Sequence, residues 1–156
     1  TNGIQAMDLV GRKLAMNNGK HWQSLMAEMI DFAEILPKSD EFNIIRKNLI
    51  KATEHSKECA LWLAQQYKEN MSNSLAGSVP FLRLLSTAIC CYLMAKGAHA
   101  AKTRLEGGDP DKGFLQSKII TARFYAEQIV PTVLSLKSAI TSGDELFFAI
   151  NAENMS

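Results

Sequence analysis

The 156 residues are enough for one domain that buries roughly two-thirds of the surface of its unfolded chain. Lysine and arginine together number 17, aspartate and glutamate 16, and the net charge is +1, with both signs interleaved along the chain. This balance excludes the basic stripe of a nucleic-acid-binding protein, so we expect no nucleic-acid partner.

The cysteines and the opening residues indicate the compartment. The three cysteines are an odd number, and Cys90 and Cys91 are adjacent on a predicted helix, where their side chains diverge by about 100°. They are predicted to be buried thiols in a reducing compartment. No charged segment followed by an apolar one opens the chain, so we expect no export signal and a cytoplasmic location.

The first three predicted helices have clear boundaries. A helix-compatible segment at 1–14 ends at an Asn-Asn-Gly sequence, and an amphipathic helix at 20–36 is stopped by Pro37. Ser39 is a plausible N-cap for a long helix that reaches about residue 70. The apolar face of this long helix contains Ser56, whose buried hydroxyl is expected to donate to the carbonyl four residues earlier.

The next segments are predicted to be a loop at 71–78 and a helix at 80–106 that is apolar on nearly all sides. Charged residues interrupt its apolar run too early for a membrane span, so a core helix is expected. One face is predicted to pack inside the domain. The other, with Leu82, Ile89 and Leu93, is predicted to meet a neighbour, which makes a homo-oligomer through residues 80–106 the expected assembly.

The longest periodic stretch follows a turn at Gly107 and Gly108. Asp109 and Pro110 resemble an N-cap and first helical residue, and the predicted helix extends to about residue 141 with a kink at Pro131. Its apolar positions alternate spacings of four and three over about seven turns. They are Leu115, Ile119, Ala122, Ala126, Ile129, Val133, Leu136 and Ile140, with Ile120, Phe124, Val130 and Leu134 widening the stripe.

The predicted fold is all-α. Ser142 and Glu145 resemble a capping box before a short last helix. The sequence has no strand alternation or internal repeat, and four long helices with short connections predict an antiparallel up-and-down four-helix bundle with short flanking N- and C-terminal helical segments.

The residues themselves point to no catalytic or metal site. No histidine has a glutamate three positions before it, which argues against a di-iron bundle, and no Cys-x-x-Cys-His haem motif occurs. His55 and Cys59 share a helix face but have no evident second ligand pair, so core packing is the stronger interpretation. Arg123 and Glu127, four residues apart, are predicted to form a structural ion pair.

Three segments resemble a known family. The opening TNGIQAMDLVGRK at 1–13 resembles the segment that follows the catalytic Glu-Gly of the FAD-dependent acyl-CoA dehydrogenases. The segments PFLRL at 80–84 and ARFYAE at 122–127 resemble the additional C-terminal helical domain of a bacterial subset of that family. The resemblance divides the chain into 1–14, the end of the catalytic-core motif with a linking helix, and 15–156, the four-helix-bundle domain.

The resemblance implies a role for the opening residues. Thr1, Asn2 and Gly3 fall where the family contacts FAD. Many members have glutamate or glutamine at the third position, so Gly3 is expected to make at most a backbone contact. The catalytic base, most of the flavin site and the acyl-CoA pocket are expected upstream, which leaves no catalytic or metal-binding residue in this chain.

The parent enzyme that the resemblance implies oxidises acyl-CoA to 2,3-enoyl-CoA using FAD. The chain is then an inactive C-terminal fragment with a structural or oligomerisation role, which partners the upstream catalytic core and retains no FAD on its own. A free-standing helical-bundle interaction module without enzymatic activity is the alternative.

Overall fold

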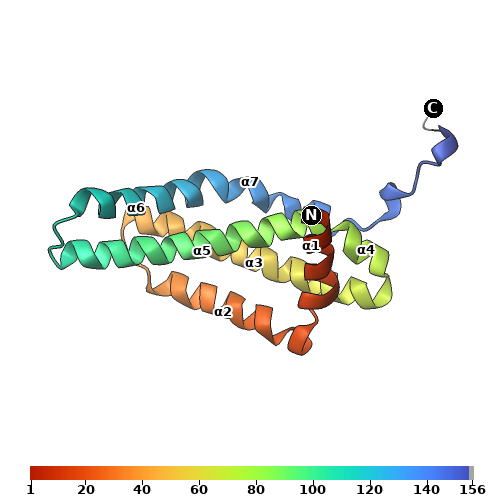
Figure 1. Cartoon of the computed structure of the whole chain (residues 1–156), viewed down its shortest axis with the longest axis horizontal. Helices are drawn as coiled ribbons and strands as arrows, with labels where there is room; N and C mark the ends of the chain where they lie inside the picture. The colour runs from red at the N-terminus through yellow and green to blue at the C-terminus, as the bar shows by residue number, and fades with distance from the viewer. Residues whose placement is uncertain (155–156) are drawn as a thin grey trace.

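The computed structural model describes residues 1–154, which form helices joined by short turns and contain no strand. The long helices are α2 (Lys20–Ile35), α3 (Asp40–Glu69) and α5 (Ser78–Glu106), followed by a segmented rod of α6 (Lys112–Phe124), α7 (Pro131–Leu134) and α8 (Leu136–Ile140). These rods run side by side and reverse direction at each connection (Figure 1). The predicted all-α fold is confirmed, and the arrangement of the rods is compatible with the predicted up-and-down four-helix bundle.

The core lies along α3 and α5, which contact each other, while α2 packs on α3 and α6 packs on α5 and α3. The predicted apolar face of α3, which includes Ser56, is buried from Phe42 to Leu63. Ser56 Oγ donates to Ala52 O at 2.7 Å, as predicted, so its buried hydroxyl is satisfied. The fully buried side chains of α3 include Phe42, Ile45, Leu49 and Leu63.

The N-terminal segment crosses the bundle instead of joining it. α1 (Asn2–Asp8) and the π-helical turn Leu9–Lys13 lie across one end of the rods, with α1 against α5 (Figure 1). Asn17, Asn18 and Gly19 all have left-handed φ values, of 51°, 53° and 79°, and they turn the chain into α2. The predicted break before residue 20 is therefore a tight left-handed turn.

The loop predicted at 71–78 is wrong, because residues Met71–Ala76 form a short helix, α4. Asn70 Oδ1 accepts the backbone N–H of Ser72 at 3.2 Å, which caps the new helix. Ser74 Oγ donates to Leu63 O at 2.9 Å and ties α4 to the end of α3. α5 then begins at Ser78, two residues before the predicted start.

The helix start predicted at Asp109 and Pro110 is also wrong. α6 begins at Lys112, and Asp111 occupies the cap position. The Asp109 carboxylate instead accepts the N–H of Asp111 at 2.9 Å and pairs with Arg104 at 2.7 Å, and both interactions lower its pKa. Asp109 therefore belongs to the turn, where Gly108 takes the left-handed φ of 80°.

The last long helix is interrupted where the proline predicts a kink. A π-helical turn at Tyr125–Ile129 precedes Pro131, with the N–H of Val130 bonded to Tyr125 O at 3.0 Å. A π turn holds one extra residue, so it rotates the following side chains around the axis. Val130 is fully buried while Ile129 is 37% exposed. The predicted seam is therefore wrong at Ile129.

The wide stripe predicted on the same helix is only partly formed. Ile120 and Phe124 are exposed, while Leu134 packs against the core. The predicted capping box does not form either, since Ser142 Oγ donates back to Ala139 O at 3.0 Å. The last segment has only 3-10 turns, Glu145–Phe147 and Ala152–Asn154, and it leaves the bundle (Figure 1).

α5 has the length and composition of a membrane-crossing helix, the one such helix found in residues 1–154. It nevertheless packs between α3 and α6 as a core helix of the bundle, as predicted. Its predicted second face is mixed: Ile89 is half-buried against the core, whereas Leu93 is 58% exposed.

Candidate functional site

The residues predicted to touch FAD lie at the start of the crossing helix. Thr1, Asn2 and Gly3 are exposed, and α1 begins at Asn2. No Cβ built on Gly3 would meet a neighbour within 4 Å, so its backbone is open to an approaching group. These residues line none of the grooves described below, and they offer a flavin one exposed edge and no enclosing wall. Alone they do not fit a complete FAD site.

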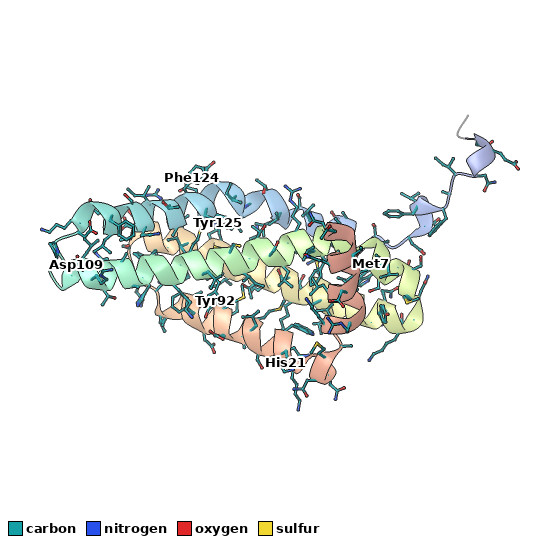
Figure 2. All side chains as sticks on the ribbon, in the orientation of Figure 1. Met7, His21, Tyr92, Asp109, Phe124 and Tyr125 are labelled. Carbon is teal, nitrogen blue, oxygen red and sulfur yellow. The ribbon has the colours of Figure 1, made fainter. Side chains whose placement is uncertain are left out.

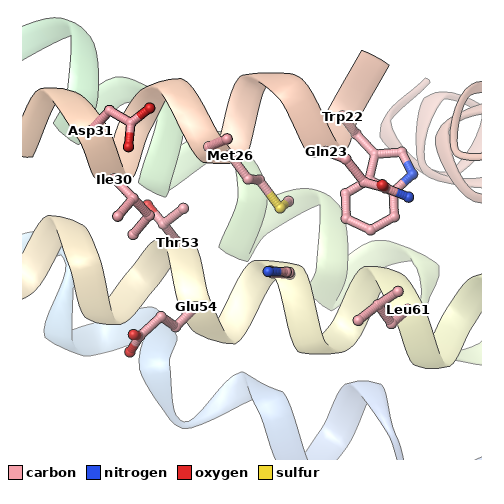
Figure 3. Close-up of a pocket in the computed structure, with 10 residues that line it drawn as sticks. Trp22, Gln23, Met26, Ile30, Asp31, Thr53, Glu54 and Leu61 are labelled. Carbon is pink, nitrogen blue, oxygen red and sulfur yellow. The ribbon is translucent and has the colours of Figure 1, made fainter. Parts of the chain in front are cut away.

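A groove lies between α2 and α3. Figure 3 shows Trp22, Met26 and Ile30 of α2 facing Thr53 and Leu61 of α3. Its volume is about 490 Å³, and an adjoining hollow of about 330 Å³ extends it toward the N-terminal segment. The polar side chains at the first hollow are Gln23, Asp31, Thr53, Glu54 and Lys57.

The groove lacks a catalytic arrangement. Thr53 Oγ1 donates to Leu49 O at 2.8 Å, so this hydroxyl is engaged within its own helix. Trp22 Nε1 donates to Leu14 O at 3.1 Å and links α2 to the N-terminal segment. No histidine or cysteine lines either hollow. The groove is therefore mainly apolar, with the charged side chains Asp31, Glu54 and Lys57 among its lining residues.

A polar cluster joins α2 and α5 on another side of the bundle. The Tyr92 hydroxyl donates to Glu28 and accepts from Lys96 Nζ at 3.2 Å, and Lys96 lies 3.9 Å from Glu28. Phe32 packs edge-on against Tyr92 with ring centroids 5.4 Å apart. The hydrogen bond to Glu28, with partial burial, raises the pKa of Tyr92, so the phenol stays protonated near neutrality and holds the helices together.

The cysteines differ from the prediction at one position. Cys59 and Cys91 are buried as expected, and burial raises their pKa values to about 11 and about 12. Both thiols are therefore protonated and unreactive at neutral pH. Cys90 is exposed, which corrects the prediction that it is buried, because successive helical residues point about 100° apart and only one of the pair can face the core.

The residues considered for a zinc site have structural roles. His55 Nδ1 lies 3.2 Å from Leu134 O, and Cys59 is in the core beside it on α3. No group of three or more His, Cys, Asp or Glu that could hold a metal occurs within residues 1–154. His99 Nδ1 is buried without a hydrogen-bond partner, with its ring edge-on to Phe32 at 5.9 Å.

Charged groups pair on the surface. Arg123 Nε lies 3.1 Å from Glu127 Oε2, which confirms the predicted structural pair. Lys137 bonds to Glu58 across the α3–α8 contact, and this hydrogen bond lowers the pKa of the Glu58 carboxyl. These pairs are exposed or half-exposed, so they orient helices and supply no isolated acid or base.

Sequence reasoning missed Arg46. Its guanidinium, on α3, donates to Ala33 O at 3.0 Å, to Pro37 O at 3.1 Å and to Leu36 O, so it caps the C-terminus of α2. A helix end exposes carbonyls that need donors, and a cation there also complements the helix dipole. The sequence has no signal for this role, because the donor lies 13 residues from the first carbonyl.

Residues 25–151 match the family described as acetyl-CoA dehydrogenase C-terminal like. The chain is 33% identical over 153 residues to a 3-methylmercaptopropionyl-CoA dehydrogenase of Ruegeria pomeroyi, covering 96% of this chain and 26% of that protein. It is 31% identical over 150 residues to a butyryl-CoA dehydrogenase of Syntrophomonas wolfei, covering 92% of this chain and 24% of that protein. The chain thus spans about a quarter of the length of these curated relatives.

Proposed function

The chain belongs to the acetyl-CoA dehydrogenase C-terminal like family, and we propose that it is the C-terminal helical domain of an FAD-dependent acyl-CoA dehydrogenase. The parent enzyme oxidises acyl-CoA to 2,3-enoyl-CoA in the cytoplasm. The observation that carries the proposal is the coverage. Nearly all of this chain aligns with about a quarter of the length of each relative, and these relatives are named as CoA dehydrogenases.

The division between core and bundle is proposed at 1–14 and 15–156. The left-handed turn at Asn17, Asn18 and Gly19 supports it, because this turn separates the crossing helix from the rods. In the proposed enzyme Thr1, Asn2 and Gly3 form one edge of the flavin site, which the upstream core completes. FAD supplies the acceptor for the hydride, and the bundle residues do not touch the reacting atoms.

The bundle has a structural and oligomerisation role in this proposal. α5 is proposed to meet a second copy, and Leu93 is the large apolar side chain that its predicted second face leaves exposed. Leu82 and Ile89 are half-buried and can contribute only their outer edges. Leu93→Lys should therefore weaken association without unfolding the bundle, whereas Ile35→Lys, at another exposed apolar position, should leave association unchanged.

The full-length protein tests the proposal directly. It should purify yellow with bound flavin and form enoyl-CoA from an acyl-CoA with a dye acceptor. The chain 1–156 alone should be colourless and inactive, since it contains three of the proposed flavin contacts and no catalytic base. Retention of flavin by chain 1–156, or a full-length protein that lacks both flavin and activity, would contradict the proposal. In the second case the interaction-module alternative would stand.

A further inference from the structure

The last described segment exposes a run of large apolar side chains. Leu146, Phe147, Phe148 and Ile150 are 83%, 69%, 73% and 61% exposed. Figure 1 shows this segment extending away from the bundle beyond α8. Removing such a side chain from water is favourable, and residues 1–154 leave these four, within five positions, largely exposed.

The root of the segment is fixed on the bundle. The backbone N–H of Asp144 donates to Asn73 Oδ1 at 3.0 Å, and Asn73 Nδ2 donates to Gln66 Oε1 at 2.8 Å. Gly143 has a left-handed φ of 79°, and a Cβ there would lie 2.9 Å from Asn73 Oδ1. The turn is built for a glycine against Asn73, so it sets the place from which the apolar residues depart.

The direction of departure is shared with the N-terminal segment. α1 and the tail both lie toward the same end of the long axis, opposite the turn at Asp109 (Figure 1; Figure 2 labels Met7 and Asp109). Ile4 and Met7 on α1 are also exposed apolar residues. In the proposed enzyme the chain upstream of Thr1 continues from this same end.

We propose that residues 145–150 are a strap that docks on the catalytic core of the same chain. The inference rests on the proposed function, and the length of the relatives supports it, because about three-quarters of each lies outside the part that this chain matches. The family match extends to residue 151 and so includes the strap. Residues 141–154 contain acidic side chains and no lysine or arginine, so the receiving surface is apolar with a basic rim.

Hydrogen exchange on the full-length protein tests the strap. The double variant Phe147→Ser, Phe148→Ser removes two anchors, and Phe114→Ser is the matched control, an exposed phenylalanine on α6 near the opposite end. In wild type and in the control, the amides of 145–150 should exchange at least about tenfold more slowly than they do in the double variant. Carbodiimide cross-linking of mixed light and heavy-isotope chains should join Glu145 to lysines upstream of Thr1 within one chain.

Equal, fast exchange of 145–150 in wild type and in the double variant would overturn the inference. Cross-links from Glu145 to a different chain would overturn it as well, because the strap would then bind a second copy. Flavin content and acyl-CoA oxidation separate the two proposals. A yellow, active enzyme with an unprotected strap refutes the strap alone, whereas a protein without flavin and activity refutes both.

Discussion

Gly77 is a position where one added carbon should loosen the bundle. It lies between α4 and α5, and a Cβ there would be 2.4 Å from the backbone oxygen of Ile140 and 3.1 Å from Leu63 Cδ2. The φ of Gly77 is −81°, which alanine adopts freely, so the conflict is one of space alone. A backbone oxygen cannot rotate away. Gly77→Ala must therefore displace the end of α8 from the α4–α5 junction.

The magnitude follows from two opposing effects. Overpacking a close contact costs about 1–3 kcal/mol. Replacing glycine by alanine stabilises the fold by about 0.4–1 kcal/mol, because it lowers the conformational entropy of the unfolded chain. The free energy of unfolding of Gly77→Ala should therefore fall by about 1–2 kcal/mol, and the melting temperature by about 2–8 °C for a chain of this size. Urea unfolding followed by circular dichroism, together with a thermal melt, measures both.

Gly113→Ala is the matched control for this change. Gly113 lies in α6, and nothing is found within 4 Å of a Cβ built there. The same substitution should leave the free energy of unfolding unchanged or raise it by up to about 1 kcal/mol. If Gly77→Ala were as stable as wild type, or if both variants lost stability equally, the close approach of Ile140 to Gly77 would not limit the fold.

Four further predictions use the same unfolding assays or a thiol titration. Arg46→Lys should lose about 1–2 kcal/mol, because one ammonium cannot reach all three carbonyls at the end of α2; full stability would refute the capping role. Asn18→Gly should gain about 0.5–1 kcal/mol and Asn18→Ala should lose about 1 kcal/mol, since only glycine adopts a φ of 53° without cost; the reverse order would contradict the left-handed turn. Lys137 lowers the folded-state pKa of Glu58, so the pair stabilises the fold above the ordinary pKa of 4.5 and ceases to do so as the pH falls through the folded pKa. Glu58→Gln should therefore lower the free energy of unfolding by less than about 1 kcal/mol at pH 7 in low salt. A difference that persists in strong acid would exclude the pair as its cause. A thiol reagent should titrate Cys90 alone in the native protein and the other two cysteines only after unfolding; three fast thiols would contradict the burial.

The long helices could be predicted because their signals are local. The apolar spacing of α3 and α5, together with Pro37 and the glycine pair after α5, determined the bundle and most of its boundaries. α4 was missed although Asn70 caps it locally, because the contact that ties it to α3 is not local. Ser74 bonds to Leu63, 11 residues earlier, and no periodic pattern marks that contact in the sequence.

The π turn shows why a regular pattern can still mislead. A spacing of four and three through Ile129 assumes uniform helical rotation, and the proline was expected only to bend the axis. Pro131 has no N–H to donate, and the helix accommodates this with an extra residue in the preceding turn, where the N–H of Val130 donates to Tyr125 O. Burial then moves to Val130, and no count of apolar residues distinguishes that outcome from a simple kink.

The candidate site was predicted from resemblance, and the residues alone could not have located it. Thr1, Asn2 and Gly3 carry no chemistry that spacing would recognise, and their proposed role depends on groups outside this chain. The flavin contacts therefore remain a prediction. The exposed strap could have been found in the sequence as four apolar residues in Leu146 to Ile150, but the capping-box interpretation assigned them to a short last helix.

In the proposed enzyme the role of this domain is contact with other parts of the protein. Arg123 pairs with Glu127 and Lys137 with Glu58, Arg46 caps a helix, and burial holds two of the three thiols protonated. Large apolar side chains are exposed at several places among residues 1–154, and those of α1 and of the strap both lie toward one end of the bundle. In the proposed enzyme the upstream core would continue from this end, and contact with that core would remove these side chains from water. The bundle would then contact the core through two segments, the crossing helix and the strap, and would not be joined to it by a single linker alone.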